Sequence, residues 1–181
     1  IIEETYYRVP NENTDSAISY PDACGELKRL LDAAVQRRLV ADVPLGTFLS
    51  GGIDSSVVTA LAAASVPGLK TFTVGFDGAG LYDESSFALE MVKKYGTDHH
   101  EIRINEKELL ESVTHFFGYN DEPFADSSAI AVSALCKKTR EVVTVALSGD
   151  GADEIFGGYN KHAAHLRAIS GLDSRILMKV I

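Results

Sequence analysis

An apolar run at residues 45–49 leads into the sequence SGGIDSS at residues 50–56, and an alanine-rich helical pattern follows at once. Glycines at the end of a strand let the backbone turn sharply, so that its N–H groups can approach a bound anion. The helix that follows directs its free amides and the positive end of its dipole at the same point. The serines add hydroxyl donors. This junction therefore predicts a phosphate-binding loop.

The loop lacks the signatures of two common phosphate-binding motifs. Gly46 and Gly51 have the spacing of a Walker-type loop, but Gly52 stands where that loop needs a lysine. The spaced third glycine of the dinucleotide fingerprint is also missing. Asp54 falls in the first helical turn, where it could hold a Mg²⁺ ion that bridges phosphates. The alternative is an ordinary strand–turn–helix in which Asp54 caps the helix.

A second apolar run, at residues 142–147, leads into SGDGADEIFGGY at residues 148–159. Three carboxylates, those of Asp150, Asp153 and Glu154, lie within five positions. Crowding them in a buried site would raise their proton affinity unless a cation neutralised them. A Mg²⁺ ion shared with phosphate oxygens would do so. The alternative is a solvated acidic loop with turn glycines.

The remaining hydrophobic patterns alternate between strands and helices. Strand patterns occur at residues 71–76, 102–104 and 142–147, and helical patterns at residues 27–39, 57–64, 84–95, 106–117 and 127–140. Such alternation predicts crossover units and an α/β fold, with a doubly wound parallel sheet and helices on both faces. Ligands of such sheets bind at the carboxyl ends of the strands. We therefore expect the two glycine loops to converge there.

Composition narrows the class of protein. A chain of 181 residues can form one domain with a substantial core, and a net charge of −9 argues against a nucleic-acid surface. Cys24 and Cys136 form no CxxC pair, which fits a reducing compartment. No apolar run approaches the ~20 residues that span a bilayer, and the first residues do not resemble a signal peptide. We expect a cytoplasmic protein without a membrane partner.

Two further polar stretches have competing interpretations. His99 and His100 would point to opposite faces of a strand, so they cannot easily share one metal ion. In NDEPFADSSA, at residues 120–129, Asp126 or Ser127 could cap the following helix, or the acids and hydroxyls could line the substrate side of a cleft. The chain carries no Gly-x-Ser-x-Gly elbow and no Ser/His/Asp order.

Several of these motifs carry a family resemblance. SGGIDSS resembles the pyrophosphatase loop of N-type ATP pyrophosphatases, and DVPLGTFLSGGIDSSVV, at residues 42–58, is similar to the synthetase domain of glutamine-hydrolysing asparagine synthetases. SGDGADEIFGGY and DEPFADSSA also look like segments of that family. The resemblance runs from about residue 22 to about residue 167. It implies a nucleotide α-hydrolase (HUP-like) architecture.

The resemblance also implies a set of site residues. Asp54 and Asp153 would hold Mg²⁺, and Asp150 would take the acidic position used in forming an acyl-adenylate, where many members carry Glu. The backbone of Val74 would meet the adenine. The implied ATP-binding residues are Leu49, Ser50, Gly51, Gly52, Asp54, Ser55, Val74, Ser148 and Gly149.

The implied reaction is the activation of the aspartate side-chain carboxylate by ATP. It gives β-aspartyl-AMP and pyrophosphate, and ammonia then displaces AMP to give asparagine. Two alternatives stay open. One is a related amidotransferase or β-lactam-forming synthetase that acts on another carboxylate. The other is a nucleotide-binding module without turnover.

The family pattern extends beyond this chain at both ends. Its members begin with a glutaminase domain whose N-terminal cysteine releases ammonia from glutamine, whereas this chain begins with Ile1. They also continue past the position of Ile181 with basic residues that face the pyrophosphate. We expect residues 1–21 to be a linker and residues 22–181 to be a truncated synthetase domain. Such a fragment would retain the nucleotide half-site and could be inactive alone; a homodimer is left open.

Overall fold

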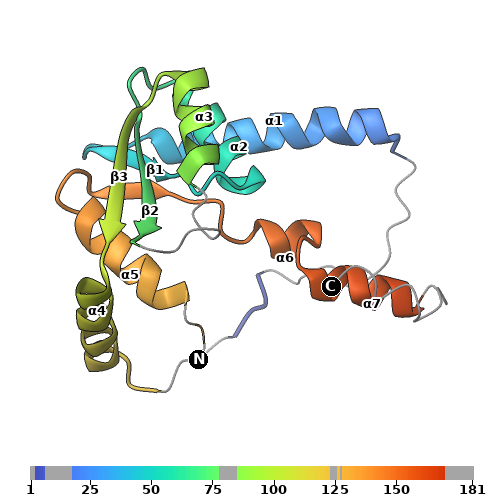
Figure 1. The fold of residues 1–181 in the computed structure, drawn as a ribbon. Helices are drawn as coiled ribbons and strands as arrows, with labels where there is room; N and C mark the ends of the chain where they lie inside the picture. Colours follow the sequence, from blue (N-terminus) through green and yellow to red (C-terminus); the bar gives the residue numbers. More distant parts are fainter. Residues whose placement is uncertain (1–2, 7–17, 78–84, 123–125, 127, 170–181) are drawn as a thin grey trace.

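The computed structural model describes residues 3–6, 18–77, 85–122, 126 and 128–169. Figure 1 shows the elements in chain order. They are α1 (Tyr20–Leu39), β1 (Leu45–Phe48), α2 (Ile53–Ala63), β2 (Lys70–Phe76), α3 (Ser85–Tyr95), β3 (Asp98–Ile104), α4 (Glu106–Tyr119), α5 (Ser128–Thr139), β4 (Val145–Leu147), α6 (Ala152–Phe156) and α7 (Asn160–Ile169). The alternation predicted from the sequence is confirmed.

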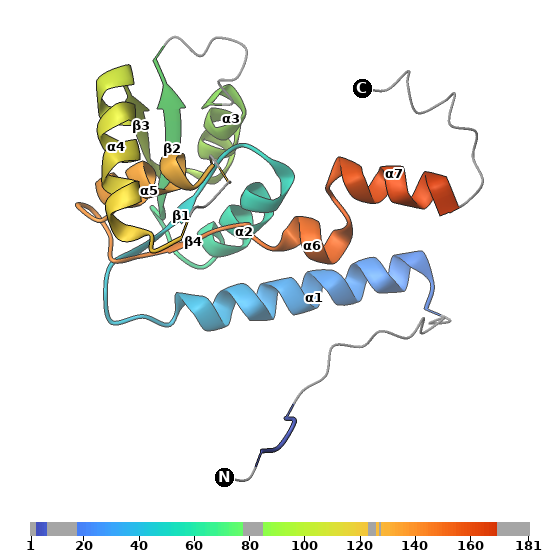
Figure 2. The ribbon, with the colours of Figure 1, turned by 90° about the horizontal axis from the view of Figure 1, so that it is seen from below.

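The four strands form one parallel sheet in the order β3-β2-β1-β4. The chain first moves outward from β1 through β2 to β3 and then returns to place β4 on the other side of β1. Because parallel crossovers are right-handed, this reversal sends the later helices to the opposite face. Figure 2 shows α2 and α3 on one side of the strands, and α4 and α5 on the other. The doubly wound α/β fold is confirmed.

Alternating side chains of the strands supply two cores, one on each face of the sheet. Phe72 packs with Leu135 of α5 and with Val143 on one face. On the other face, Thr47 and Thr59 are fully buried, and their hydroxyl oxygens lie 2.9 Å apart. This hydrogen bond satisfies two polar groups in the interior and ties β1 to α2 directly beneath the first glycine loop.

Several element boundaries differ from the sequence predictions, and three of these differences have a clear physical cause. β4 covers only Val145–Leu147, because Val142 and Val143 donate to the carbonyl of Thr139 in the turn that ends α5. β3 starts at Asp98 rather than near residue 102, since it pairs with β2 along its whole length. α1 begins at Tyr20, inside the predicted lead-in, because the Ser19 hydroxyl caps the helix by accepting from the Asp22 amide.

The two histidines of β3 face opposite sides of the sheet, as predicted. His99 Nδ1 lies 2.9 Å from the Thr71 hydroxyl oxygen, whereas the His100 ring stacks on Phe72 with ring centroids 5.1 Å apart. Within the described ranges, no group of three or more His, Cys, Asp or Glu side chains is arranged to hold a metal ion. The two histidines therefore contribute side-chain contacts between the neighbouring strands β2 and β3.

Two further observations concern the cysteines and the length and apolar character of the helices. Both Cys24 and Cys136 are exposed free cysteines. Every helix in the described part of the chain lacks the length or the apolar character needed to cross a lipid bilayer.

The burial of His99 predicts a pH-dependent stability. Burial lowers the pKa of His99, and the nearby Glu101 carboxylate opposes this effect only in part. As pH falls through the ordinary histidine range, about 6.5, the unfolded chain therefore takes up the proton before the folded chain does. The free energy of unfolding should therefore be highest above this range, and it should fall as the pH is lowered from 7.5 to 5.5.

His99→Gln should flatten this pH dependence. The matched control is His165→Gln, because His165 is exposed on α7. Urea midpoints at the two pH values measure the effect. If the urea midpoints of the wild type and of His99→Gln fell by the same amount between the two pH values, the pH dependence could not be assigned to His99.

Candidate active site

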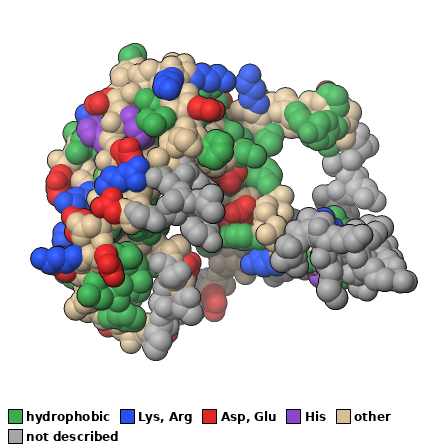
Figure 3. Space-filling view, viewed as in Figure 1, with side chains coloured by type: hydrophobic (Ala, Val, Ile, Leu, Met, Phe, Trp, Pro, Cys, Tyr) green, Lys and Arg blue, Asp and Glu red, His purple; other side chains and the backbone are tan. Residues whose placement is uncertain are grey.

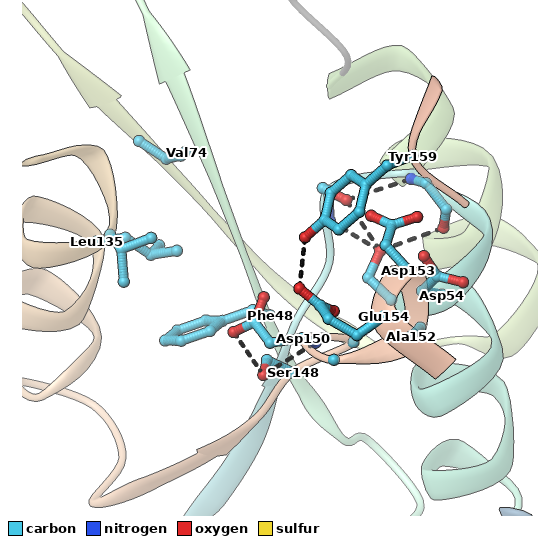
Figure 4. Close-up of a pocket in the computed structure, with 16 residues that line it drawn as sticks. Phe48, Asp54, Val74, Leu135, Ser148, Asp150, Ala152, Asp153, Glu154 and Tyr159 are labelled. Atoms are coloured by element: carbon cyan, nitrogen blue, oxygen red, sulfur yellow. Dashed lines mark hydrogen bonds between the residues drawn. The ribbon is translucent and has the colours of Figure 1, made fainter. Parts of the chain in front are cut away.

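A cleft of about 340 Å³ opens at the carboxyl ends of β1, β2 and β4. Parallel pairing of β1 with both neighbours brings the three strand ends to the same edge of the sheet. The loop from β1 to α2 forms one side, and the loop from β4 to α6 forms another (Figure 4). The two glycine loops predicted to converge thus line one cleft.

The first loop is held by its own serines. Gly51 adopts a positive φ of 89°, which a side chain would disfavour, and Gly52 is the N-cap of α2 without a side-chain hydrogen bond. The Ser50 and Ser55 hydroxyl oxygens lie 3.0 Å apart, and the Gly52 amide donates to Ser50 Oγ at 3.2 Å. Asp54 therefore lies within the first turn, and Gly52 takes the capping position.

The second loop packs directly against the first turn of α2. A Cβ atom on Gly149 would lie 2.7 Å from the Ser55 amide nitrogen and 2.9 Å from Asp54 Cβ. Only glycine permits this approach without displacing backbone. Beyond it, the Ser148 hydroxyl donates to Asp150 Oδ2 at 2.9 Å and fixes that carboxylate near the start of the loop.

The one-turn helix α6 brings two more acids to the cleft. Asp153 and Glu154 occupy its first turn, and the helix ends at Gly157, whose φ is 70°. The chain then returns, so that the Tyr159 hydroxyl donates to Glu154 Oε1 at 2.6 Å (Figure 4). This hydrogen bond raises the pKa of Tyr159 to about 12 and lowers the pKa of Glu154.

Carboxylates dominate the charge of the cleft. Asp54, Asp150, Asp153 and Glu154 all line it, whereas its lining includes no Lys, Arg or His among the described residues. Figure 3 shows acidic and hydrophobic side chains side by side in the region between α2 and α6. Such a cleft repels a free anion and requires cations to accept one.

The donor set can be compared with the needs of Mg²⁺. This ion commonly uses one or two protein carboxylates and completes its octahedron with water and phosphate oxygens. Asp54 at the start of α2 and Asp153 at the start of α6 enter the cleft from its two loops (Figure 4). These two carboxylates therefore fit a Mg²⁺ ion that is shared with a phosphate-bearing ligand.

The opposite wall of the cleft is apolar. It consists of Phe48, Val74, Val132 and Leu135, which come from β1, β2 and α5. Phe48 and Val74 also pack against the core that contains Phe72 and Leu135. A flat apolar wall opposite a polar loop suits a ligand with an aromatic ring at one end and phosphates at the other.

The sequence profile of the asparagine synthase family matches residues 26–176. The chain belongs to the asparagine synthase family. A putative asparagine synthetase 2 (glutamine-hydrolyzing) from Methanocaldococcus jannaschii is 41% identical over 139 residues, which are 76% of this chain and 27% of that protein. Asparagine synthetase 1 of Bacillus subtilis is 38% identical in an alignment of 158 residues that covers 84% of this chain and 25% of that protein.

Other similar proteins are more diverse. The amidase chyE of Penicillium rubens is 35% identical in an alignment of 157 residues that covers 78% of this chain and 23% of that protein. Among solved structures, an NH3-dependent NAD synthetase from Campylobacter jejuni shows a distant similarity, with a TM-score of 0.48, 14% identity, and coverage of 75% of this chain and 60% of that one. The chain spans about a quarter of the length of these curated relatives.

Most residues of the asparagine synthase motifs lie on the cleft surface. The lining includes Ser50, Gly52, Asp54, Ser55, Val74, Ser148, Gly149, Asp150 and Asp153. Gly51 supports the first loop through its backbone conformation. Leu49 differs from these, because the residue is only 1% exposed, and its amide and carbonyl bond to the Phe72 carbonyl and the Thr73 hydroxyl. Leu49 therefore lies buried behind the loop, away from the cleft surface.

One acid of the segment before α5, Asp126, contacts the first residue of that helix. Asp126 Oδ1 accepts from the Ser128 amide at 2.9 Å, and this contact with Ser128 lowers the pKa of Asp126. The structure thus gives Asp126 the capping role, one of the two roles considered from the sequence. Ser127 and residues 123–125 lie outside the described residues.

The sequence patterns did not indicate the bond between Glu154 and Tyr159 or the apolar residues of the cleft. Glu154 and Tyr159 belong to a recognised motif, but nothing in their spacing of five positions indicates that their side chains bond. Phe48, Val132 and Leu135 are typical core residues in sequence, and only the fold shows that they border an open cleft. An apolar residue at the last position of a strand that precedes a glycine loop, such as Phe48, was the one available signal.

The contact between the two loops predicts that Gly149→Ala destabilises the chain. The added methyl group must displace the backbone of Ser55 and Asp54, at a cost of about 1–3 kcal/mol in the free energy of unfolding. Urea denaturation measures this cost.

Gly25→Ala is the matched control for this substitution. Gly25 lies in α1, and a Cβ atom there would meet nothing within 4 Å. This change should stabilise the chain by about 0.5–1 kcal/mol, because alanine favours the helix. An unchanged urea midpoint for Gly149→Ala would contradict the close contact of the loops.

Proposed function

We propose that residues 22–181 form the ATP-binding part of an amide-forming ligase that activates a carboxylate as its adenylate. The observation that carries this proposal is a cleft in which the two glycine loops meet, with carboxylates on one side and apolar side chains on the other. Membership of the asparagine synthase family supports the same assignment.

The nucleotide is proposed to lie across the cleft from its apolar wall to the first loop. The adenine would lie near Phe48 and the backbone of Val74, and the phosphates would lie over the amides at the start of α2. Free amides at a helix N-terminus are good donors to phosphate oxygens. Ser148 and Gly149, at the end of β4, would border the α-phosphate.

Mg²⁺ is proposed to bind between Asp54, Asp153 and the phosphates. When bound, the ion would neutralise phosphate charge and stabilise the pyrophosphate leaving group. Asp54 and Asp153 would hold the ion, and the loop amides would share the remaining phosphate charge. Two carboxylates are enough for this purpose, because phosphate oxygens and water complete the coordination.

The reaction is proposed to proceed in two displacements. A carboxylate oxygen of the acceptor attacks the α-phosphorus, and the bond to the pyrophosphate oxygen breaks. Ammonia then attacks the acyl carbon, AMP departs with the acyl C–O electron pair, and the nitrogen loses one proton. Asp150, whose carboxylate is oriented by Ser148, would act where the adenylate forms. The chain contributes mainly positioning and electrostatic stabilisation.

Aspartate is the proposed acceptor, and a glutaminase domain is the proposed source of ammonia. The curated relatives from Methanocaldococcus jannaschii and Bacillus subtilis bear the name asparagine synthetase [glutamine-hydrolyzing]. A second candidate is an amidotransferase that acts on another carboxylate, since one relative is called an amidase. Both candidates use the same activation chemistry and differ in the acceptor.

Exchange of labelled pyrophosphate into ATP is the test of the proposed function. The purified chain, with Mg²⁺, should catalyse exchange when aspartate is added. Exchange with a different acid from a panel of carboxylic acids would favour the second candidate. Binding of ATP with Mg²⁺ in calorimetry, without exchange for any acid, would contradict ligase activity of this chain and leave a nucleotide-binding module.

Asp54→Asn should weaken the binding of ATP in the presence of Mg²⁺ by about tenfold or more, because a charged ligand of the ion becomes neutral. Calorimetry with and without Mg²⁺ separates this effect from a general loss of binding. Asp32→Asn, at an exposed position of α1, is the matched control and should retain the affinity. Equal affinities of Asp54→Asn and the wild type would exclude Asp54 as a ligand of the ion.

A further inference from the structure

Tyr159 and Glu154 form a bonded pair on the wall of the cleft. The Tyr159 hydroxyl donates to Glu154 Oε1 at 2.6 Å, and both side chains line the cleft (Figure 4). The pair depends on the tight end of α6, where the amide of Gly158 donates to the carbonyl of Asp153 at 3.1 Å. Because the chain turns back at this point, Tyr159, which follows α6, can bond Glu154 in the first turn of that helix.

The Tyr159 ring is itself held in place by its neighbours. Lys161 Nζ lies 4.5 Å from the ring centroid, and the His162 ring meets the Tyr159 ring edge-on, with centroids 5.4 Å apart. Cation–π and aromatic contacts of this kind favour one orientation of the ring. A tyrosine fixed in this way restricts the rotamers of the glutamate that it bonds, and Glu154 would otherwise be an exposed, flexible side chain.

The four carboxylates of the cleft differ in their contacts. Asp54 and Asp153, one from each loop, are the two carboxylates that fit a Mg²⁺ ion. The Asp150 carboxylate accepts from the hydroxyl of its neighbour Ser148. Glu154 accepts from Tyr159 through one oxygen. A carboxylate offers about four acceptor positions, so Glu154 can accept further hydrogen bonds from a ligand.

We propose that Tyr159 positions Glu154 to accept the ammonium group of an amino acid, so that this pair selects acceptors that carry an ammonium group. The inference rests on the proposed function, since it concerns the acceptor of the same reaction. A dicarboxylate without an ammonium group adds only negative charge to a cleft whose described lining has no cationic side chain. An ammonium group that bonds Glu154 compensates one of those charges.

The test compares two acceptors that differ in this group. The chain is first saturated with Mg²⁺ and a non-hydrolysable ATP analogue, α,β-methylene-ATP. Calorimetry then measures the affinities for L-aspartate and for succinate, which lacks the ammonium group. We expect the wild type to prefer aspartate by about tenfold or more, since hydrogen bonds to charged groups are strong and every tenfold is 1.4 kcal/mol.

Two variants test the two members of the pair. Glu154→Gln should reduce the ratio of the affinities for aspartate and succinate to near one. Tyr159→Phe should reduce the ratio in part, because the carboxylate remains but is no longer fixed. Since the ratio is formed within each variant, a general loss of binding cancels. Circular dichroism and urea midpoints establish that each variant is folded.

The matched controls lie away from the cleft. Tyr95→Phe removes the hydroxyl of another tyrosine with a lysine near its ring, since Lys94 Nζ lies 5.4 Å from the Tyr95 centroid. Glu111→Gln removes an exposed carboxylate of α4. Both should retain the wild-type ratio.

The outcomes separate this inference from the proposed function. If aspartate binds and supports exchange but the ratio is unchanged in both variants, the role of the pair is wrong and the ligase proposal stands. If another amino acid replaces aspartate and depends on Glu154, the inference holds and the aspartate assignment is wrong. If no carboxylic acid binds the nucleotide-loaded chain, both are overturned.

Discussion

The parallel pairing of β1 with strands on both of its sides is the constraint on which the site depends. β1 lies between β2 and β4, which are separated from each other in the chain by three helices and one strand. Parallel pairing forces all three strands to end at the same edge. The reversal of the strand order at β1 leaves room there, because the crossovers depart on opposite faces. The two chemical motifs, about a hundred residues apart, thereby become neighbours.

Close approach of the two loops then determines the electrostatics of the cleft. Because Gly149 has no side chain, the loop after β4 lies against the first turn of α2 and brings Asp150 and Asp153 into the cleft that Asp54 lines. Such crowding of negative charge is unfavourable in the absence of a counter-charge. The packing that creates the cleft therefore also creates its requirement for cationic ligands.

The sequence predicted the elements of this arrangement better than their contacts. Strand and helix periodicity, together with the glycines after two strands, was sufficient to predict a parallel sheet and loops that meet at one edge. The pairing of Glu154 with Tyr159 could not be predicted in this way, because it depends on the left-handed turn at Gly157. Similarly, Val143 has strand character in sequence, but a turn bonded to Thr139 places it in the core.

The two loops differ in how firmly hydrogen bonds and burial hold them in place. The first loop stands on the buried hydrogen bond between Thr47 and Thr59, and its serines bond to one another. The second loop leads into a helix of five residues with no buried side chain, so that its acids are held mainly by single hydrogen bonds such as that from Tyr159. A phosphate-bearing ligand gains most from the rigid loop, because fixed donors need no reorganisation. Under the proposed function, acceptor recognition would depend on the acids of the second loop, because a few hydrogen bonds keep these carboxylates oriented toward the ligand.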